Sequence, residues 1–221
     1  MKHYIFTRWN LLTDSSDLYN NSLIKDKDSW MRHRVELFEK YTLPSVMKQT
    51  NKNFIWLLSF SKNTPKHYYQ KYLQNKFIKI IHTSHIKYLK DNLISDNIFI
   101  TSRLDNDDVI FPEYINTIQK SIGNYTTILD SYGYSYNILT KKWYIPPERK
   151  RTNSPFLTLV EFLNPGEFPK TCFYDQHSVM PDYFPGRWIN KQTNPLYCII
   201  VHDKNLMNKS LGKEIIVKNS F

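Results

Sequence analysis

The sequence contains few glycines and cysteines, and it has no long hydrophobic run. Only 5 of its 221 residues are glycine, which excludes the glycine-rich phosphate loops of Rossmann dehydrogenases and P-loop NTPases. Cys172 and Cys198 are the only cysteines. They are too few for a disulfide framework and lack the spacing of a zinc site, so we expect buried, reduced thiols. No stretch approaches the ~20 apolar residues that a membrane span needs.

The N-terminal residues 1–8 carry too few apolar side chains for a signal peptide. Together with the reduced cysteines and the lack of a membrane span, this predicts a soluble, cytoplasmic protein. A peripheral contact with a membrane is left open as an alternative.

The chain is basic, with 30 Lys and Arg against 20 Asp and Glu and a net charge of +10. A positive field attracts anions such as nucleoside diphosphates, nucleic acid, anionic lipids or acidic glycans. The scattered lysines are equally typical of an ordinary solvated surface. Because no nucleic-acid-binding module is recognisable, we expect no nucleic-acid partner.

Strands alternate with helices in the first half, which predicts an α/β fold with a parallel sheet. We see no boundary that divides the chain, so residues 1–221 are expected to form one domain. The expected strands are 4–7, 54–60, 77–82, 97–101, 126–129, 171–174 and 196–201, with a hairpin over 132–144. The expected helices are 30–49, 65–75, 112–122 and 154–162.

Three carboxylates follow the strand expected at 97–101, and they belong to Asp105, Asp107 and Asp108. Their mutual repulsion is unfavourable unless a cation or Arg103 compensates it. In an extended segment, Asp105 and Asp107 would face one point. Mg2+ and Mn2+ prefer carboxylate oxygens and often share them with phosphates. Since α/β sheets bind ligands beyond the carboxyl ends of their strands, we predict a metal and diphosphate site here.

The simplest alternative for this cluster is a polar turn, because Asp and Asn favour turns. A calcium loop is excluded. It requires a ligand, a glycine and an acidic residue at positions that are occupied here by Val109, Ile110 and Asn116.

Several short sequence motifs occur in the order expected of one enzyme family. Through these motifs the chain, from about residue 5 to 210, resembles the putative rhamnosyltransferase family of GT-A glycosyltransferases. Trp9 stands where phenylalanine is common in that family. The matching motifs are Phe6-Thr7-Arg8-Trp9-Asn10, Trp30 with Arg34 and Glu36-Leu37-Phe38, Leu43-Pro44-Ser45 with Gln49, Phe54-Ile55-Trp56, Thr64-Pro65, Ser102-Arg103-Leu104-Asp105-Asn106-Asp107-Asp108, Phe156-Leu157-Thr158-Leu159-Val160-Glu161, His177, and Val201-His202 with Asn205 and Asn208.

The resemblance implies a GT-A-like fold, with a mostly parallel central sheet flanked by helices. It implies transfer of a sugar from a UDP-, GDP- or dTDP-linked donor. The family name implies rhamnose, and another sugar is the alternative. The acceptor would be a hydroxyl of a glycan or glycoconjugate, and the transfer would be inverting and dependent on Mn2+ or Mg2+. We expect the donor-binding half at about 1–125 and the acceptor and catalytic half at about 126–221.

Site roles follow from this resemblance and from the residue chemistry. We expect the nucleotide sugar to contact Thr7, Arg8, Arg34, Arg103, Asp105 and Asn106. The expected metal ligands are Asp107, Asp108 and His202. For Arg103, pairing with an aspartate is an equal alternative, and Asp108 could instead serve as a carboxylate at a helix start.

An inverting transfer needs a general base for the acceptor hydroxyl. The candidates are Asp175, His177 and Glu161, and Asp175 is favoured because it follows the strand expected at 171–174. The aromatic residues of the hairpin could line an acceptor groove, but packing is the preferred interpretation. These are Tyr132, Tyr134, Tyr136, Trp143 and Tyr144.

Two other classes of function remain as rivals. A metal-dependent phosphodiesterase or nuclease would need dispersed Asp and His ligands for two cations, and the early part of the chain lacks such pairs. A non-catalytic basic module that binds glycans or nucleic acid would show no response to a nucleotide sugar or to Mn2+.

Overall fold

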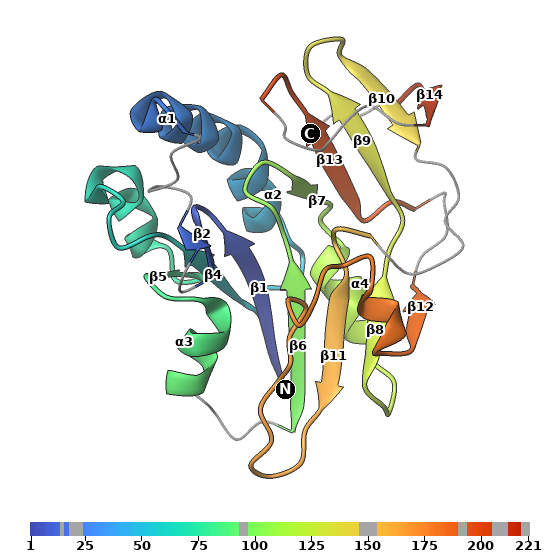
Figure 1. Cartoon of the computed structure of the whole chain (residues 1–221). Coiled ribbons are helices and arrows are strands. Elements are labelled where there is room, and N and C mark those ends of the chain that lie inside the picture. The colour runs from blue at the N-terminus through green and yellow to red at the C-terminus, as the bar shows by residue number, and fades with distance from the viewer. Residues whose placement is uncertain are drawn as a thin grey trace.

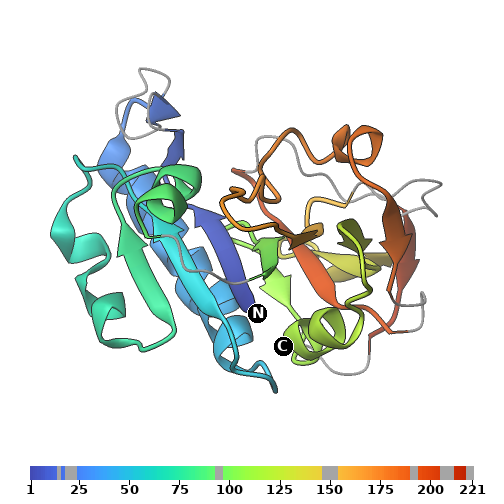
Figure 2. The same ribbon diagram turned by 90° about the horizontal axis from the view of Figure 1, so that it is seen from below.

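The computed structural model describes residues 1–13, 16–17, 24–92, 97–145, 154–189, 194–204 and 212–217. A seven-stranded sheet and a five-stranded sheet organise these residues (Figure 1). Seen from below, the first half of the chain (blue to green) and the second half (yellow to red) lie side by side (Figure 2). Both sheets contain strands from both halves of the chain.

The larger sheet has the order β12-β8-β11-β6-β1-β4-β5. Its pairs β1–β4, β1–β6, β4–β5 and β8–β12 are parallel, whereas β11 pairs antiparallel with β6 and β8. This confirms the predicted mostly parallel central sheet. The strands are β1 (Lys2–Arg8), β4 (Ile55–Ser59), β5 (Ile78–Ile81), β6 (Ile98–Arg103), β8 (Thr127–Asp130), β11 (Thr158–Phe162) and β12 (Gly186–Trp188).

The two faces of this sheet bury alternate residues, as the two-residue period of a strand requires. Ile5 and Trp56 face one core, which also contains residues of η2 (Phe38–Thr42), α2 (Leu43–Met47) and α4 (Tyr114–Lys120). Phe6 and Leu57 face the other core. There they meet α3 (His85–Asp91), the turn after Lys170 and η5 (Met180–Asp182).

The helix expected at 30–49 is a continuous helical run of three parts, because α1 (Lys27–Leu37) continues into η2 and α2. Its cap is Asp26, whose carboxylate accepts from the Ser29 N–H at 2.9 Å. The run widens into one π-helical stretch, where the Leu43 N–H donates to the Phe38 carbonyl five residues earlier. Pro44 follows directly, and the wider turn accommodates a residue that has no N–H to donate.

Three expected elements differ from the structure, and one helix was not expected. Residues 154–162 form no helix but a turn followed by β11, since Thr158-Leu159-Val160 pairs between β6 and β8. Residues 171–174 form a turn, and Thr171 has a φ of 71° that no strand permits. Two 3-10 turns, η3 (Lys66–Tyr68) and η4 (Gln70–Gln74), replace the helix expected at 65–75, and α3 was missed.

The five-stranded sheet has the order β14-β10-β9-β13-β7 and contains the predicted hairpin. Its short strand β7 directly follows the acidic residues, and β13 leads directly into His202. Both cysteines are free and buried, as expected. Within the described ranges, no helix is long and apolar enough to span a membrane. The strands are β7 (Val109–Ile110), β9 (Gly133–Asn137), β10 (Lys142–Ile145), β13 (Tyr197–Val201) and β14 (Lys213–Ile215), and a separate small ribbon joins β2 (Leu11–Thr13) to β3 (Ser16–Asp17).

Candidate active site

The candidate site lies where the neighbouring parallel strands β1 and β6 end. Thr7, near the end of β1, is fully buried. Its hydroxyl donates to the Leu104 carbonyl at 2.7 Å and accepts from the Trp56 indole N–H at 2.9 Å. The structure therefore does not support Thr7 as a nucleotide contact. Thr7 instead fixes the start of the acidic loop, residues 105–108.

Asp107 is the best-compensated carboxylate of the acidic loop. It is buried, and its Oδ2 lies 2.8 Å from Arg34 Nη1 and 3.0 Å from His202 Nε2. Burial alone would raise the pKa of Asp107, but Arg34 and His202 overcome this and hold it below its ordinary value. The structure thus brings together three predicted site residues that come from α1, the loop after β6 and the end of β13.

Asp108 has a different environment from its neighbour. It is buried, and its Oδ1 accepts from the Ile200 N–H of β13 at 2.8 Å. Burial and the charges of Asp107 and Asp105 raise its pKa well above the ordinary value, against the effect of the Ile200 hydrogen bond. The expected metal role of Asp108 stays a prediction. This carboxyl group ties β13 to the acidic loop two residues before His202.

Asp105 and Asp107 do not converge on one point through an extended segment. The loop turns here, with a contact of 3.4 Å from the Asp108 N–H to the Asp105 carbonyl. Asp105 is 38% exposed and lies 3.5 Å from the Arg103 guanidinium, which is the pairing that we considered as an alternative. Asn106 is buried, and its Nδ2 has no hydrogen-bond partner among the described residues.

A cleft of about 400 Å³ is lined by Arg8 and Arg103 together with Phe173, Asp175, Gln176 and His177. The Arg8 guanidinium lies 4.2 Å from the centre of the Phe173 ring, and that of Arg103 lies at 5.4 Å. No carboxylate of the described residues forms an ion pair with Arg8. Burial and Arg103 lower the pKa of Arg8, which reflects two cations held close together. Such a cleft favours an anion.

Two of the three candidate bases line this cleft, namely Asp175 and His177. Glu161 does not. It is buried, and its carboxylate oxygens accept from the N–H groups of Lys170 at 2.7 Å and Thr171 at 3.0 Å. Burial raises the pKa of Glu161 despite these bonds. The structure corrects this candidate, because Glu161 stabilises the strained turn at Thr171 and is not free to accept a substrate proton.

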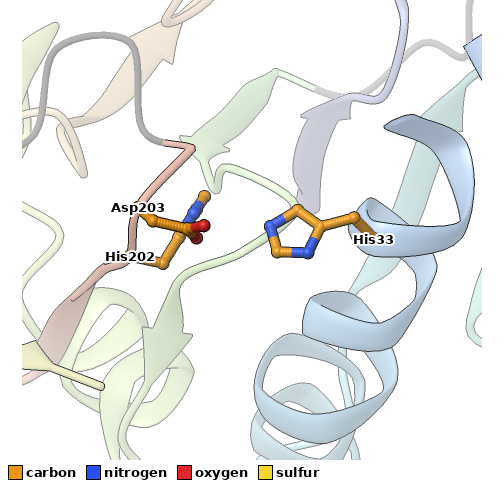
Figure 3. A group of neighbouring side chains, drawn as sticks. All are labelled: His33, His202 and Asp203. Carbon is orange, nitrogen blue, oxygen red and sulfur yellow. The ribbon is translucent and has the colours of Figure 1, made fainter. Parts of the chain in front are cut away.

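His202 also belongs to a group that the sequence did not predict. Its ligand atoms and those of His33 and Asp203 all lie within 4.8 Å of one another (Figure 3). His33 comes from α1, and its buried Nε2 has no hydrogen-bond partner in the described part of the chain. Burial, Lys204 and His202 lower the pKa of His33, which favours the neutral, metal-binding form of the ring. Two imidazoles and a carboxylate fit a divalent cation such as Mn2+.

The aromatic residues of the hairpin pack within the second sheet. The Trp143 ring is buried and lies 4.7 Å from Tyr136 and 6.2 Å from Tyr134, between ring centres. Trp143 belongs to a core cluster that also includes Cys198 and Ile200. None of the five lines the cleft. These contacts agree with packing, the preferred interpretation.

A family model described as "Putative rhamnosyl transferase" matches residues 7–213 of this chain. The chain belongs to this family. The match includes every residue discussed in the cleft and the acidic loop, so both are part of the family's own domain. No curated protein sequence matches the chain significantly.

Solved structures of S. aureus TarS have a similar fold. S. aureus TarS 1-349 in complex with UDP is 16% identical, with a TM-score of 0.51 over 91% of this chain. S. aureus TarS is 14% identical, with a TM-score of 0.50 over 91% of this chain. The chain spans 61% of the first of these structures and 37% of the second. At such identities the likeness establishes the GT-A fold alone.

Proposed function

We propose that this chain is a glycosyltransferase that moves a sugar from a nucleoside diphosphate to a hydroxyl group of a glycan or glycoconjugate. The observation that carries this proposal is the cleft itself. Two half-buried guanidinium groups, Arg8 and Arg103, line it beside the acidic loop, at the carboxyl ends of parallel strands where α/β sheets bind ligands. Family membership supports the same activity, and the related TarS structure contains UDP.

In this proposal the two arginines bind the diphosphate of the donor. A guanidinium group can donate two parallel hydrogen bonds to phosphate oxygens, and its charge stabilises the diphosphate as it leaves. Asp105 lies beside Arg103 and is partly exposed, so it is available to a ribose hydroxyl. Arg34 does not contact the donor directly in this scheme, because its role is to hold Asp107.

Asp107, His202 and the neighbouring His33 and Asp203 are the residues that would hold a divalent cation, with Mn2+ favoured over Mg2+ by the imidazoles. A cation bound there supplies positive charge to the departing diphosphate. Asp107 is kept ionised by Arg34, which keeps the carboxylate ready for this role.

Asp175 serves as the general base in this proposal. It lines the same cleft as the arginines, so its carboxylate can accept the proton of an acceptor hydroxyl that enters there. His177 is the second candidate for this step. Attack by the activated hydroxyl on the face opposite the diphosphate inverts the configuration of the sugar. Rhamnose, implied by the family name, and a UDP, GDP or dTDP carrier are the donors to test first.

A thermal-shift titration with UDP, GDP and dTDP, with and without Mn2+, tests the donor site. A ligand that binds only the folded protein should stabilise it by about 2.7 kcal/mol at 100 times its Kd. We expect one of these nucleotides to do so, and Arg8→Gln to weaken its binding about 10- to 100-fold. Arg32→Gln is the matched control, because Arg32 is 67% exposed on α1 and pairs with Asp28. No response to any of the nucleotides would reject the proposed function.

A further inference from the structure

Two exposed tyrosines lie next to each other on the segment that forms one side of the cleft. Tyr174 is 46% exposed and Tyr183 is 54% exposed. Their ring centres are 5.3 Å apart, and the ring planes meet at 84°. The two rings are therefore nearly perpendicular to each other. Exposed aromatic rings in contact with each other are typical of a binding surface.

Local backbone hydrogen bonds order the segments that carry this aromatic pair, Tyr174 and Tyr183. The Tyr174 N–H donates to the Thr171 carbonyl at 3.0 Å, and the Tyr183 N–H donates to the Met180 carbonyl at 3.0 Å. Beneath Tyr174 lies the buried ring of Phe184, with 5.8 Å between ring centres. A surface that is already ordered loses little conformational entropy when a ligand binds.

The aromatic pair is continuous with the cleft through Asp175. The Tyr183 hydroxyl hydrogen-bonds to the Asp175 carboxylate, and Asp175 lines the cleft with Arg8 and His177. Tyr174 is the residue directly before Asp175. A ligand that rests on the aromatic pair would therefore place its nearest polar groups at the proposed general base.

The chemistry of the pair favours a sugar ring over an apolar partner. A pyranose has an apolar C–H face, which suits an aromatic ring, and hydroxyl groups around its edge. Polar groups surround the pair, since Asp175 contacts Tyr183 and the Lys170 ammonium lies 5.3 Å from the centre of the Tyr174 ring. An apolar partner would leave these groups without water or hydrogen bonds.

We propose that the aromatic pair is an acceptor subsite, which binds a saccharide ring of the glycan acceptor and directs its hydroxyl toward Asp175. This inference rests on the proposed function and extends it by naming the surface that holds the acceptor. It predicts that acceptor binding and nucleotide binding depend on different residues.

Binding to a printed array of oligosaccharides, compared between the wild type and variants, tests this subsite. The first variant is Tyr174→Ala with Tyr183→Ala, and the second is Tyr174→Gln alone. Tyr125→Ala is the matched control, because Tyr125 is similarly exposed, at 52%, and makes no ring contact with Tyr174 or Tyr183 among the described residues. We expect the double variant to lose about tenfold or more in glycan binding, a loss typical of buried aromatic contacts. The control should bind like the wild type.

Each outcome has a separate meaning when nucleotide-induced thermal stabilisation is measured on the same variants. Glycan binding that is lost while nucleotide stabilisation is kept supports the subsite. Equal glycan binding by the wild type and the double variant overturns it, and so does a wild type that binds nucleotide but no glycan on the array. Binding to vesicles of phosphatidylcholine and phosphatidylglycerol that disappears in the double variant would instead identify a membrane contact. Loss of the nucleotide response in the wild type would reject the proposed function itself.

Discussion

The acidic loop and the neighbouring cleft differ in how their charged side chains are balanced. In the loop, Asp107 is buried and contacts both Arg34 and His202. In the cleft, Arg8 packs on Phe173 and forms no ion pair with a carboxylate of the described residues. The loop is thus internally compensated and pre-organised, whereas Arg8 in the cleft has no such counter-charge. The difference indicates that the protein provides its own counter-charge for Asp107 and leaves Arg8 for an anionic ligand.

A second contrast lies within the acidic loop. Asp107 and Asp108 are adjacent, yet the pKa of Asp107 is lowered and that of Asp108 is raised. Burial acts on both in the same direction, so their partners make the difference. Asp107 contacts an arginine and a histidine, whereas Asp108 contacts a backbone N–H and is repelled by its acidic neighbours. The first is suited to bind a cation as a carboxylate, and the second to tie β13 to the acidic loop.

The largest effect is expected for Asp107→Asn. Turnover should fall about a thousandfold, because the amide cannot balance the cation and Arg34 then lies near the donor without its partner. Stability should fall by about 2 kcal/mol through the loss of the charge-assisted hydrogen bonds. Sugar-transfer assays and urea denaturation measure the two effects. Asp91→Asn is the control, since Asp91 is exposed and pairs only with Lys87 on α3. Unchanged turnover would remove Asp107 from the site.

A large effect confined to the cleft is expected for Asp175→Asn. The rate of transfer should fall about a hundredfold or more, because an amide cannot accept the acceptor proton. Nucleotide-induced stabilisation should not change, since the arginines are retained. The pH dependence of the rate measures the first effect, with exposed Asp182→Asn as the control. If the pH profile and rate match those of the wild type, the base is another residue, and His177→Gln becomes the next variant.

The smallest effect is expected for Asp108→Asn, measured by urea denaturation in EDTA. Because the pKa of Asp108 is raised on folding, the folded protein holds more protons, and stability falls as pH rises from about 4 toward that pKa. An asparagine keeps an acceptor for the Ile200 N–H without this cost. The variant should match the wild type near pH 4.5 and exceed it by about 1 kcal/mol at pH 8. If the stability of the wild type increases relative to that of the variant as pH rises, the environment assigned to Asp108 is wrong.

The sequence predicted well those features that depend on neighbouring residues. Most of the apolar strands, the hairpin and the acidic residues at the end of β6 were visible as local patterns. The motifs shared with the family also identified His202 as a site residue, although it lies 95 positions beyond Asp107. These features follow from strand periodicity and from the chemistry of carboxylates, which need no knowledge of the fold.

Features that depend on distant partners were not predictable in this way. The role of Asp108 is set by Ile200, and that of Glu161 by a turn whose shape depends on the positive φ of Thr171. The apolar run Thr158-Leu159-Val160 suits a helix or a strand, and its pairing with β6 decides the outcome. His33 gave no signal, because its relation to His202 exists only when α1 packs near the end of β13.

The most direct measurement is a crystal structure of the protein with Mn2+ and the nucleoside diphosphate that stabilises it most. The account predicts an ion bound to Asp107 and His202, with the diphosphate on the guanidinium groups of Arg8 and Arg103. A nucleotide that is bound elsewhere, with the Asp107 oxygens still held only by Arg34 and His202, would contradict it.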